Sequence, residues 1–115
     1  MLTCCNRYRI DPAQREAFAE YGRRWVELTN RHGGVHHGFF MASELQSHPQ
    51  LSFPAFGSEA GSDVAFAWYS FADEAGYHAF RASVKDDPDC APAEALARET
   101  GCILGYERSF LNRVA

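Results

Sequence analysis

The sequence predicts an α+β domain in which a four-stranded antiparallel sheet carries its helices on one face. Two observations lead to this prediction. The expected elements follow the order strand–helix–strand twice along the 115 residues. The third expected strand, VAFAWYSF at Val64–Phe71, is also apolar on both faces, which is typical of a strand that is covered on both sides. Two right-handed crossovers then give the ferredoxin-like βαββαβ arrangement with strand order 4-1-3-2, and residues 1–115 form a single domain.

The first strand and helix have clear boundaries. Residues 2–10 alternate, so that one face carries Leu2, Cys4, Asn6, Tyr8 and Ile10 and the other carries Thr3, Cys5, Arg7 and Arg9. Asp11 and Pro12 suit a helix cap and a first helical position. The apolar stripe of this helix follows at steps of three and four, as Phe18, Tyr21, Trp25, Leu28 and His32. The Gly33-Gly34 pair is expected to end it.

Residues 35–42, VHHGFFMA, predict the second strand, with Val35, Phe39 and Met41 on one face and Phe40 and Ala42 on the other. The following residues 43–63 are rich in Ser, Gly and Pro and have no clear period. A segment of this length is expected to form a long loop, a lid or a hairpin extension of the flanking strands. Its Leu51, Phe53 and Phe56 provide apolar material with which it could fold back.

The second half repeats the strand–helix–strand order after Val64–Phe71. Asp73 is a suitable cap for a helix over residues 73–84, whose inward stripe is Tyr77, Phe80 and Val84. Residues 92–100 predict a short helix that ends at Gly101. The last strand is CILGYERSFL at residues 102–111, with Cys102, Leu104, Tyr106, Arg108 and Phe110 on one face.

Composition excludes several classes of protein. A formal charge of -4 without a basic tract argues against a nucleic-acid or anionic-membrane binder. No apolar run reaches the roughly 18 residues that a membrane span needs. The N-terminus lacks the pattern of a secretory signal, so we expect a cytoplasmic protein with reduced thiols. The four cysteines form no CxxC pair, and Cys5 is the candidate for a reactive thiol because Arg7 and Arg9 share its face.

The two main helices can cover only one face of the sheet. The opposite face is also expected to be apolar, and an exposed apolar sheet face indicates an interaction surface. The simplest partner is a second copy of the chain, packed sheet against sheet with two-fold symmetry. The alternative is a monomer in which the long loop 43–63 covers that face.

Several segments together resemble the NIPSNAP-like branch of the dimeric α/β-barrel superfamily. They are CCNRYRIDP, AEYGRRWVELTNRHGG, HHGFFM, FAWYSFADEAGYHAFR, DDPDC and CILGYERSFL, which cover almost the whole chain. The resemblance implies a ferredoxin-like fold and a barrel built from two sheets, near small monooxygenases without cofactors, haem-degrading enzymes and stress-responsive dimers. It transfers no catalytic residue. Of the haem-degrading pattern only Asn6-Arg7 matches, since Tyr77 and Asp87 stand where that pattern has Trp and His.

Candidate site residues come from the histidines and from the even-numbered strand positions. His32, His36 and His37 could converge, but His36 and His37 point to opposite faces of a strand, so structural roles are favoured over a metal site. If the protein is an enzyme, the candidate catalytic residues are His36 or His37, whichever faces the pocket, and Arg108. The candidate ligand-binding residues are Asn6, Tyr8, Trp68, Tyr69, Tyr106 and Arg108. If they share a face, they suit a planar, anionic or carbonyl-bearing ligand; otherwise the aromatics are core and Arg108 pairs with an acid such as Glu44 or the partner's Glu107.

The function predicted from the sequence is therefore binding of a small hydrophobic or aromatic molecule by a homodimer. The reaction would be a monooxygenation or isomerisation that needs no cofactor, in which the protein stabilises an enolate-like anion. The alternatives are a non-catalytic dimeric module that binds another protein, and, with least support, a haem-binding or haem-degrading protein. A closed aromatic cavity containing Asn6, Arg108 or a His would favour the first reading, and an exposed loop tip at Phe53 or Phe56 the second.

Overall fold

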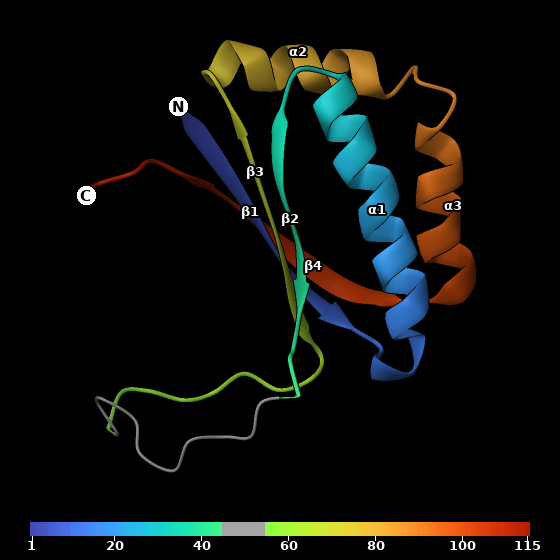
Figure 1. Cartoon of the computed structure of the whole chain (residues 1–115), viewed down its shortest axis with the longest axis vertical. Helices are drawn as coiled ribbons and strands as arrows, with labels where there is room; N and C mark the ends of the chain where they lie inside the picture. The colour runs from blue at the N-terminus through green and yellow to red at the C-terminus, as the bar shows by residue number, and fades with distance from the viewer. Residues whose placement is uncertain (45–54) are drawn as a thin grey trace.

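The computed structural model describes residues 1–44 and 55–115 and has the predicted element order (Figure 1). The first half contains β1 (Leu2–Ile10), the short 3-10 helix η1 (Pro12–Gln14), α1 (Arg15–Arg31) and β2 (Val35–Met41). The second half contains β3 (Val64–Phe71), α2 (Glu74–Val84), α3 (Cys90–Thr100) and β4 (Ile103–Leu111).

The strands form one antiparallel sheet in the order β2-β3-β1-β4. This is the predicted order 4-1-3-2, and it makes β1 and β3 the interior strands. All three helices lie on one side of the sheet. Figure 1 shows α1 and α3 side by side along the sheet and α2 across one end of it. The ferredoxin-like fold is therefore confirmed. The opposite sheet face, called the outer face below, is covered by none of the helices in residues 1–44 and 55–115.

The predicted helix boundaries are close to the observed ones, with two differences. Asp11 does cap, since its carboxylate accepts from the Ala13 N–H at 3.0 Å, but Pro12 opens a 3-10 turn before α1 begins. Asp73 caps α2 by accepting from the Gly76 N–H at 2.8 Å. The short helix α3 begins two residues earlier than predicted, at Cys90. Gly101 ends it with φ of +66°, a conformation that favours glycine.

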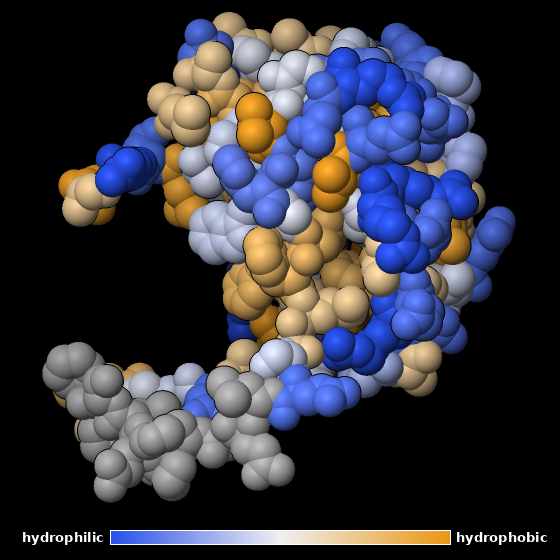
Figure 2. All heavy atoms as spheres, viewed as in Figure 1, coloured by the Kyte–Doolittle hydropathy of each residue, from blue (hydrophilic) through white to orange (hydrophobic). Residues whose placement is uncertain are grey.

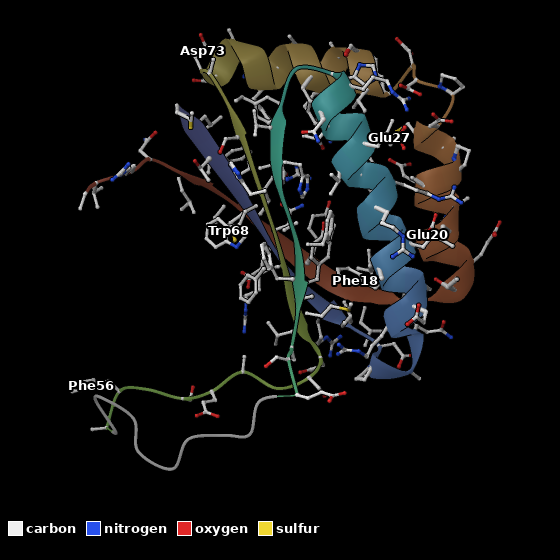
Figure 3. The ribbon with its side chains drawn as sticks, in the orientation of Figure 1. Phe18, Glu20, Glu27, Phe56, Trp68 and Asp73 are labelled. Carbon is white, nitrogen blue, oxygen red and sulfur yellow. The ribbon has the colours of Figure 1, made fainter. Side chains whose placement is uncertain are left out.

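The core fills the space between the sheet and the helices. One cluster gathers Cys4, Tyr69 and Phe71 with residues of α1, α2 and α3, and the other gathers Tyr8 and Ile10 with Phe18. The predicted faces of β1 are therefore confirmed, because its even-numbered residues point toward the helices. In β3 the odd-numbered residues do so. Figure 3 shows Phe18 between α1 and the sheet, while Trp68 projects from β3 on the side away from α1.

A bulge in β2 overturns one predicted face. His36 pairs with Tyr69 and Gly38 pairs with Trp68, so that His37 is an extra residue in the strand. Simple alternation put Val35 on the face of Phe39 and Met41, but Val35 pairs with Ser70 and lies on the outer face. The bulge reverses the alternation at this point, and Gly38, with φ of +123°, adopts the positive φ that it needs there.

The long segment between β2 and β3 contains no strand in its described parts, residues 42–44 and 55–63. A hairpin extension is not seen there, and the predictions for Leu51 and Phe53 fall outside the described residues. Phe56 is 90% exposed and stands well away from the sheet (Figure 3). Within residues 1–44 and 55–115, none of the helices has the length and apolar character to cross a membrane. The cytoplasmic location stays a prediction.

Candidate functional site

A cavity lies between the sheet and the helices, on the covered side of the sheet. Its volume is about 190 Å³. All four strands, α1, α2 and α3 contribute to its wall, with the residues Asn6, Tyr8, Tyr21, Trp25, Thr29, His36, Phe39, Tyr69, Phe80, Arg81, Glu94, Tyr106 and Arg108. The size is below the 300–1,000 Å³ that is usual for drug-sized ligands, and it suits a compound of one or two rings.

Asn6 is the centre of a hydrogen-bond network in this wall. Its Oδ1 accepts from the Tyr69 hydroxyl at 3.2 Å and from the Arg108 Nε at 3.3 Å. Its Nδ2 donates to the Tyr8 hydroxyl at 3.0 Å. The register of the sheet explains this meeting, because Asn6 pairs with Ala67 in β3 and with Arg108 in β4. Asn6 is only 7% exposed. The hydrogen bonds therefore hold a buried amide in one orientation.

Arg108 is a partly buried cation whose described partners are all neutral. Besides Asn6, its Nη1 donates to the Tyr77 hydroxyl at 3.3 Å, and its guanidinium lies 5.8 Å from the Tyr106 ring centre. Burial opposes the charge, but the nearby Tyr69, Tyr77 and Tyr106 raise its pKa above the ordinary value. The sequence left open a pairing with Glu44 or with the partner's Glu107. Within the described residues Glu107 pairs instead with Arg7, on the outer face. A partly buried cation without a carboxylate partner favours an anionic ligand.

His36 is the candidate histidine that faces the cavity. Its ring stacks on Phe39 and on Tyr69, with centres 4.9 and 5.5 Å apart. The Gly38 N–H donates to its Nδ1 at 2.9 Å. Neutral imidazole with an accepting Nδ1 carries its proton on Nε2, so that Nε2 is a donor. Burial, with His37 second, lowers the pKa of His36 to about 4, and the ring is therefore neutral at pH 7.

The other candidate histidines do not join it. His37 lies on the outer face, where its Nε2 is 2.8 Å from the Ser70 hydroxyl. His32 lies beyond α1, between the Ser83 hydroxyl and the Asp87 carboxylate. Within the described residues, no three His, Cys, Asp or Glu side chains converge as a metal site would require.

Trp68 is the ligand-binding candidate that the structure separates from the rest. Asn6, Tyr8, Tyr69, Tyr106 and Arg108 all line the cavity, whereas Trp68 pairs with Cys5 on the outer face. The sequence left open whether the even-numbered residues share a face. In β3 they do not face the cavity, because β1 pairs Asn6 with Ala67 and so matches even positions with odd ones.

Two residues of the cavity wall on α1, Tyr21 and Trp25, were not predicted as site residues. Their helical spacing indicated only that they belong to the core stripe. The indole Nε1 of Trp25 is buried without a hydrogen-bond partner among the described residues, although Trp25 lines the cavity. Leaving such a donor unpaired costs about 1–3 kcal/mol. The Tyr21 ring lies against that of Tyr8, with ring centres 6.5 Å apart, and burial raises the pKa of Tyr21 well above its ordinary value. Helical spacing by itself does not distinguish a core aromatic from a cavity-lining one.

Cys5 does not have the environment of a reactive thiol. It is 8% exposed, and burial raises its pKa. Arg7 and Arg9 share its face but extend into solvent, and neither lowers the pKa of the thiol. The environment of Cys5 therefore does not support its candidacy as a reactive thiol, because a low-pKa thiol needs a cation in close contact.

Comparison with known proteins agrees with this fold. The NIPSNAP family pattern matches residues 5–115. Among solved structures, an uncharacterised NIPSNAP domain protein from Burkholderia xenovorans has a TM-score of 0.71 at 16% identity, with 100% of this chain and 96% of that chain covered. A NIPSNAP family protein of unknown function from Agrobacterium tumefaciens has a TM-score of 0.70 at 18% identity, with 100% and 91% covered.

A variant of SnoaB, a cofactor-independent oxygenase from Streptomyces nogalater, has a TM-score of 0.56 at 16% identity, with 99% of this chain and 93% of that chain covered. No curated protein matches the sequence. The family pattern spans nearly all of the chain, from the middle of β1 to the C-terminus, and thus includes every strand and helix that lines the cavity. The chain belongs to the NIPSNAP family.

Proposed function

We propose that the cavity binds a small planar aromatic molecule with an acidic hydrogen beside a carbonyl, and that the protein is a cofactor-independent monooxygenase. The observation that carries this proposal is the partly buried Arg108, which meets Asn6 and Tyr69 in an aromatic cavity and has no described carboxylate partner. Such a site stabilises the negative charge that develops when the substrate loses its proton. The likeness of the fold to that of a cofactor-independent oxygenase supports the reaction class.

The chemistry balances without an added cofactor. The substrate methylene loses a proton to solvent and becomes an enolate, and the enolate carbon then gives its electrons to molecular oxygen. Overall, one methylene group and one molecule of oxygen give one carbonyl group and one molecule of water. The carbon loses four electrons in this change, and the two oxygen atoms gain them. Isomerisation is the alternative outcome of the same anion, since reprotonation at another carbon needs no oxygen.

Oxygen uptake tests the proposal. A panel of enolisable aromatic ketones, such as 1-indanone and 2-indanone, is incubated with the protein in an oxygen electrode, and the product is analysed after use of 18O2. Arg108→Gln should reduce the rate about 100-fold, because one donor to a developing oxyanion has about that effect. Arg98→Gln, an exposed arginine on α3, is the matched control and should leave the rate unchanged. A product that contains no 18O would show that the reaction is an isomerisation and not an oxygenation.

The outer face of the sheet supports a homodimer. It carries Phe66 and Trp68 in the central part and the exposed Val35 and Phe40 on the edge strand β2, which are 58% and 51% exposed. Figure 2 shows the molecule hollowed on the side away from the helices. Exposed apolar side chains that neighbour one another in this way are costly to leave in water. Because family resemblance implies a barrel of two sheets, we infer that a second copy covers this face.

A non-catalytic interaction module is the second candidate, and Phe56 favours it. An aromatic side chain that is 90% exposed on a projecting segment is a suitable anchor for another protein. The two candidates differ in one measurement. A ligand of the cavity raises the melting temperature if it binds the folded state, and the interaction module predicts no shift with any member of the ketone panel.

Haem binding has less support from the cavity. Its volume of about 190 Å³ is small for a tetrapyrrole. His36 carries its proton on Nε2 and so offers no free lone pair toward the cavity for an iron ligand. The Asn6-Arg7 pair is also divided, because Asn6 faces the cavity while Arg7 binds Glu107 on the outer face.

A further inference from the structure

The polar groups available to a ligand in the cavity are mainly donors. The acceptor of the Asn6 amide is already occupied, since Oδ1 receives hydrogen bonds from Tyr69 and Arg108. The Tyr8 hydroxyl likewise accepts from Asn6 and interacts with Tyr21. Acceptors inside the wall are therefore largely used by neighbouring donors. Apart from the exposed carboxylate of Glu94, the free polar groups described in this wall can donate hydrogen bonds to a ligand oxygen.

Trp25 supplies the first of these free donors. Its indole Nε1 is buried and has no partner within residues 1–44 and 55–115. An indole N–H can only donate, so it can be satisfied only by an acceptor. Buried polar groups in native proteins are nearly always paired, and an exception needs an explanation. A ligand oxygen in the cavity that Trp25 lines provides one.

His36 supplies the second donor, and the backbone fixes its role. The hydrogen bond from the Gly38 N–H to Nδ1 leaves the proton on Nε2. Protonating Nδ1 would place two donors against each other, which keeps the ring neutral. His36 therefore acts toward the cavity as a neutral donor, and proton abstraction is not its role.

We propose that the ligand of this cavity binds as its oxyanion, a phenolate or an enolate, whose oxygen accepts hydrogen bonds from the Trp25 indole and the His36 imidazole beside the Arg108 guanidinium. This inference rests on the proposed function of the cavity as a small-molecule site and adds the ionisation state of the ligand. The protein then needs no general base. It selects the ionised form from solution and shifts the ionisation equilibrium of the bound molecule toward the anion.

The other ionisable groups around the cavity are compatible with an anion. Burial raises the pKa of Tyr8, Tyr21 and Tyr69, so these phenols add no negative charge near neutral pH. Tyr106 of β4 also lines the cavity. At its wall, Arg81 of α2 and Glu94 of α3 bring one charge of each sign, and both residues are exposed, where solvent screens them.

The test uses a pair of probes that differ in ionisation. 4-Nitrophenol ionises near neutral pH with a change in its absorption spectrum, and 4-nitroanisole has nearly the same shape but cannot ionise. Both are titrated with the full-length protein between pH 5 and pH 9. We expect bound 4-nitrophenol to show the phenolate spectrum about one pH unit lower than the free compound, and we expect it to bind at least about tenfold more tightly than 4-nitroanisole.

Three variants assign the donors. Trp25→Phe and His36→Phe keep an aromatic ring and remove one N–H each, and each should weaken phenolate binding about tenfold, the effect of losing one hydrogen bond to a charged group. Trp68→Phe, at the other tryptophan on the outer face, is the matched control and should change nothing. The affinity for 4-nitroanisole measures whether each variant keeps its cavity, so a misfolded variant is recognised by its loss.

The outcomes distinguish the oxyanion inference from the proposal that the cavity is a small-molecule site. If both probes bind equally well at all pH values, the oxyanion inference is overturned while the cavity remains a small-molecule site. If neither probe binds, both are overturned. A phenolate preference that survives Trp25→Phe and His36→Phe would refute the role of the two neutral donors.

Discussion

The backbone N–H of Gly38 donates to the Nδ1 of His36 at 2.9 Å, across the bulge of β2. This single contact depends on the positive φ of Gly38, which is +123°. It turns the imidazole toward Phe39 and Tyr69, fixes the proton on Nε2 and brings the ring into the cavity wall. The bulge thus converts one of two adjacent histidines into a candidate site residue and leaves the other on the outer face.

Gly38→Ala should destabilise the protein by about 1–2 kcal/mol, because an L side chain is strained at a positive φ. The space around the added Cβ is ordinary, with Phe40 at 3.4 Å, so backbone strain is the cause that is tested. Urea unfolding measures the loss. Gly105→Ala, in β4 with open space around it, is the control and should be close to neutral. Equal stability of both variants would contradict the role given to the bulge.

His36 should make stability depend on pH between about 6.5 and 4. Its pKa is lowered to about 4 in the folded state, so the unfolded chain binds a proton first as the pH falls. The stabilisation is fully present above the ordinary value of about 6.5 and is lost as the pH falls toward 4, by on the order of 2–3 kcal/mol. The difference in unfolding free energy between the wild type and His36→Phe should therefore become smaller as the pH falls. His78→Gln, on the exposed side of α2, serves as control, and parallel curves for His36→Phe would count against the burial of a neutral ring.

Asp87 should cause a separate loss of stability at more acidic pH. The Asp89 backbone N–H, with His32 and Arg31, holds the pKa of this carboxyl well below its usual range. A carboxyl with a lowered pKa contributes its full stabilisation above the ordinary value of about 3.9. This contribution is lost gradually as the pH falls from that value through the lower pKa of the folded state. Asp87→Asn should lower the melting temperature at pH 7 and have a much smaller effect at pH 2, closer to the lowered pKa of the folded state. The neighbouring Asp86→Asn is the exposed control; an equal loss at both pH values would show that the charge of Asp87 is not what stabilises the junction of α1 and α2.

Gly22 lets α1 approach β2. A Cβ added at Gly22 would lie 2.9 Å from the Phe39 Cγ and 3.1 Å from the Phe39 Cβ. These two Phe39 atoms lie close to the backbone and cannot move aside as the end of a flexible side chain could. Gly22→Ala should therefore destabilise the protein by about 1–3 kcal/mol in spite of its better helix propensity. Gly76→Ala in α2 meets its nearest atoms at 3.4 and 3.6 Å and should be neutral or stabilising by up to about 1 kcal/mol. Thermal unfolding compares the two; a stabilised Gly22→Ala would show that the helix does not press on Phe39.

The homodimer is tested at the outer face. Phe40 is 51% exposed and pairs across the sheet with Phe66, so Phe40→Asp should separate the two copies and leave the core of each intact. Sedimentation at micromolar concentration should give the wild type roughly twice the 12.9 kDa chain mass and give Phe40→Asp the mass of one chain. Phe56→Asp, on the projecting segment, is the control and should remain dimeric. A wild type that sediments as a single chain would refute the dimer.

Most of the fold could be predicted from the sequence because its signals are local. The capping residues Asp11 and Asp73 and the terminator Gly101 act within one turn of their helices. Strand alternation likewise assigned the faces of β1 correctly, since neighbouring side chains must point to opposite sides. The order of elements and the chirality of the crossovers then restricted the sheet to one topology.

The site itself depends on relationships between strands and helices. Pairing between β1 and β3 determines that Tyr69, and not Trp68, stands beside Asn6, and no local pattern contains that register. The bulge reverses the alternation of β2 and places His36 in the cavity wall, although an isolated Gly38 was its only sign. The unpaired Trp25 N–H is visible only once α1 lies on the sheet. The sequence by itself determined the elements and their order, because these follow from contacts a few residues apart. Tertiary structure decided which side chains share the cavity and which donors it leaves free, because pairing and packing join residues that are far apart in the chain.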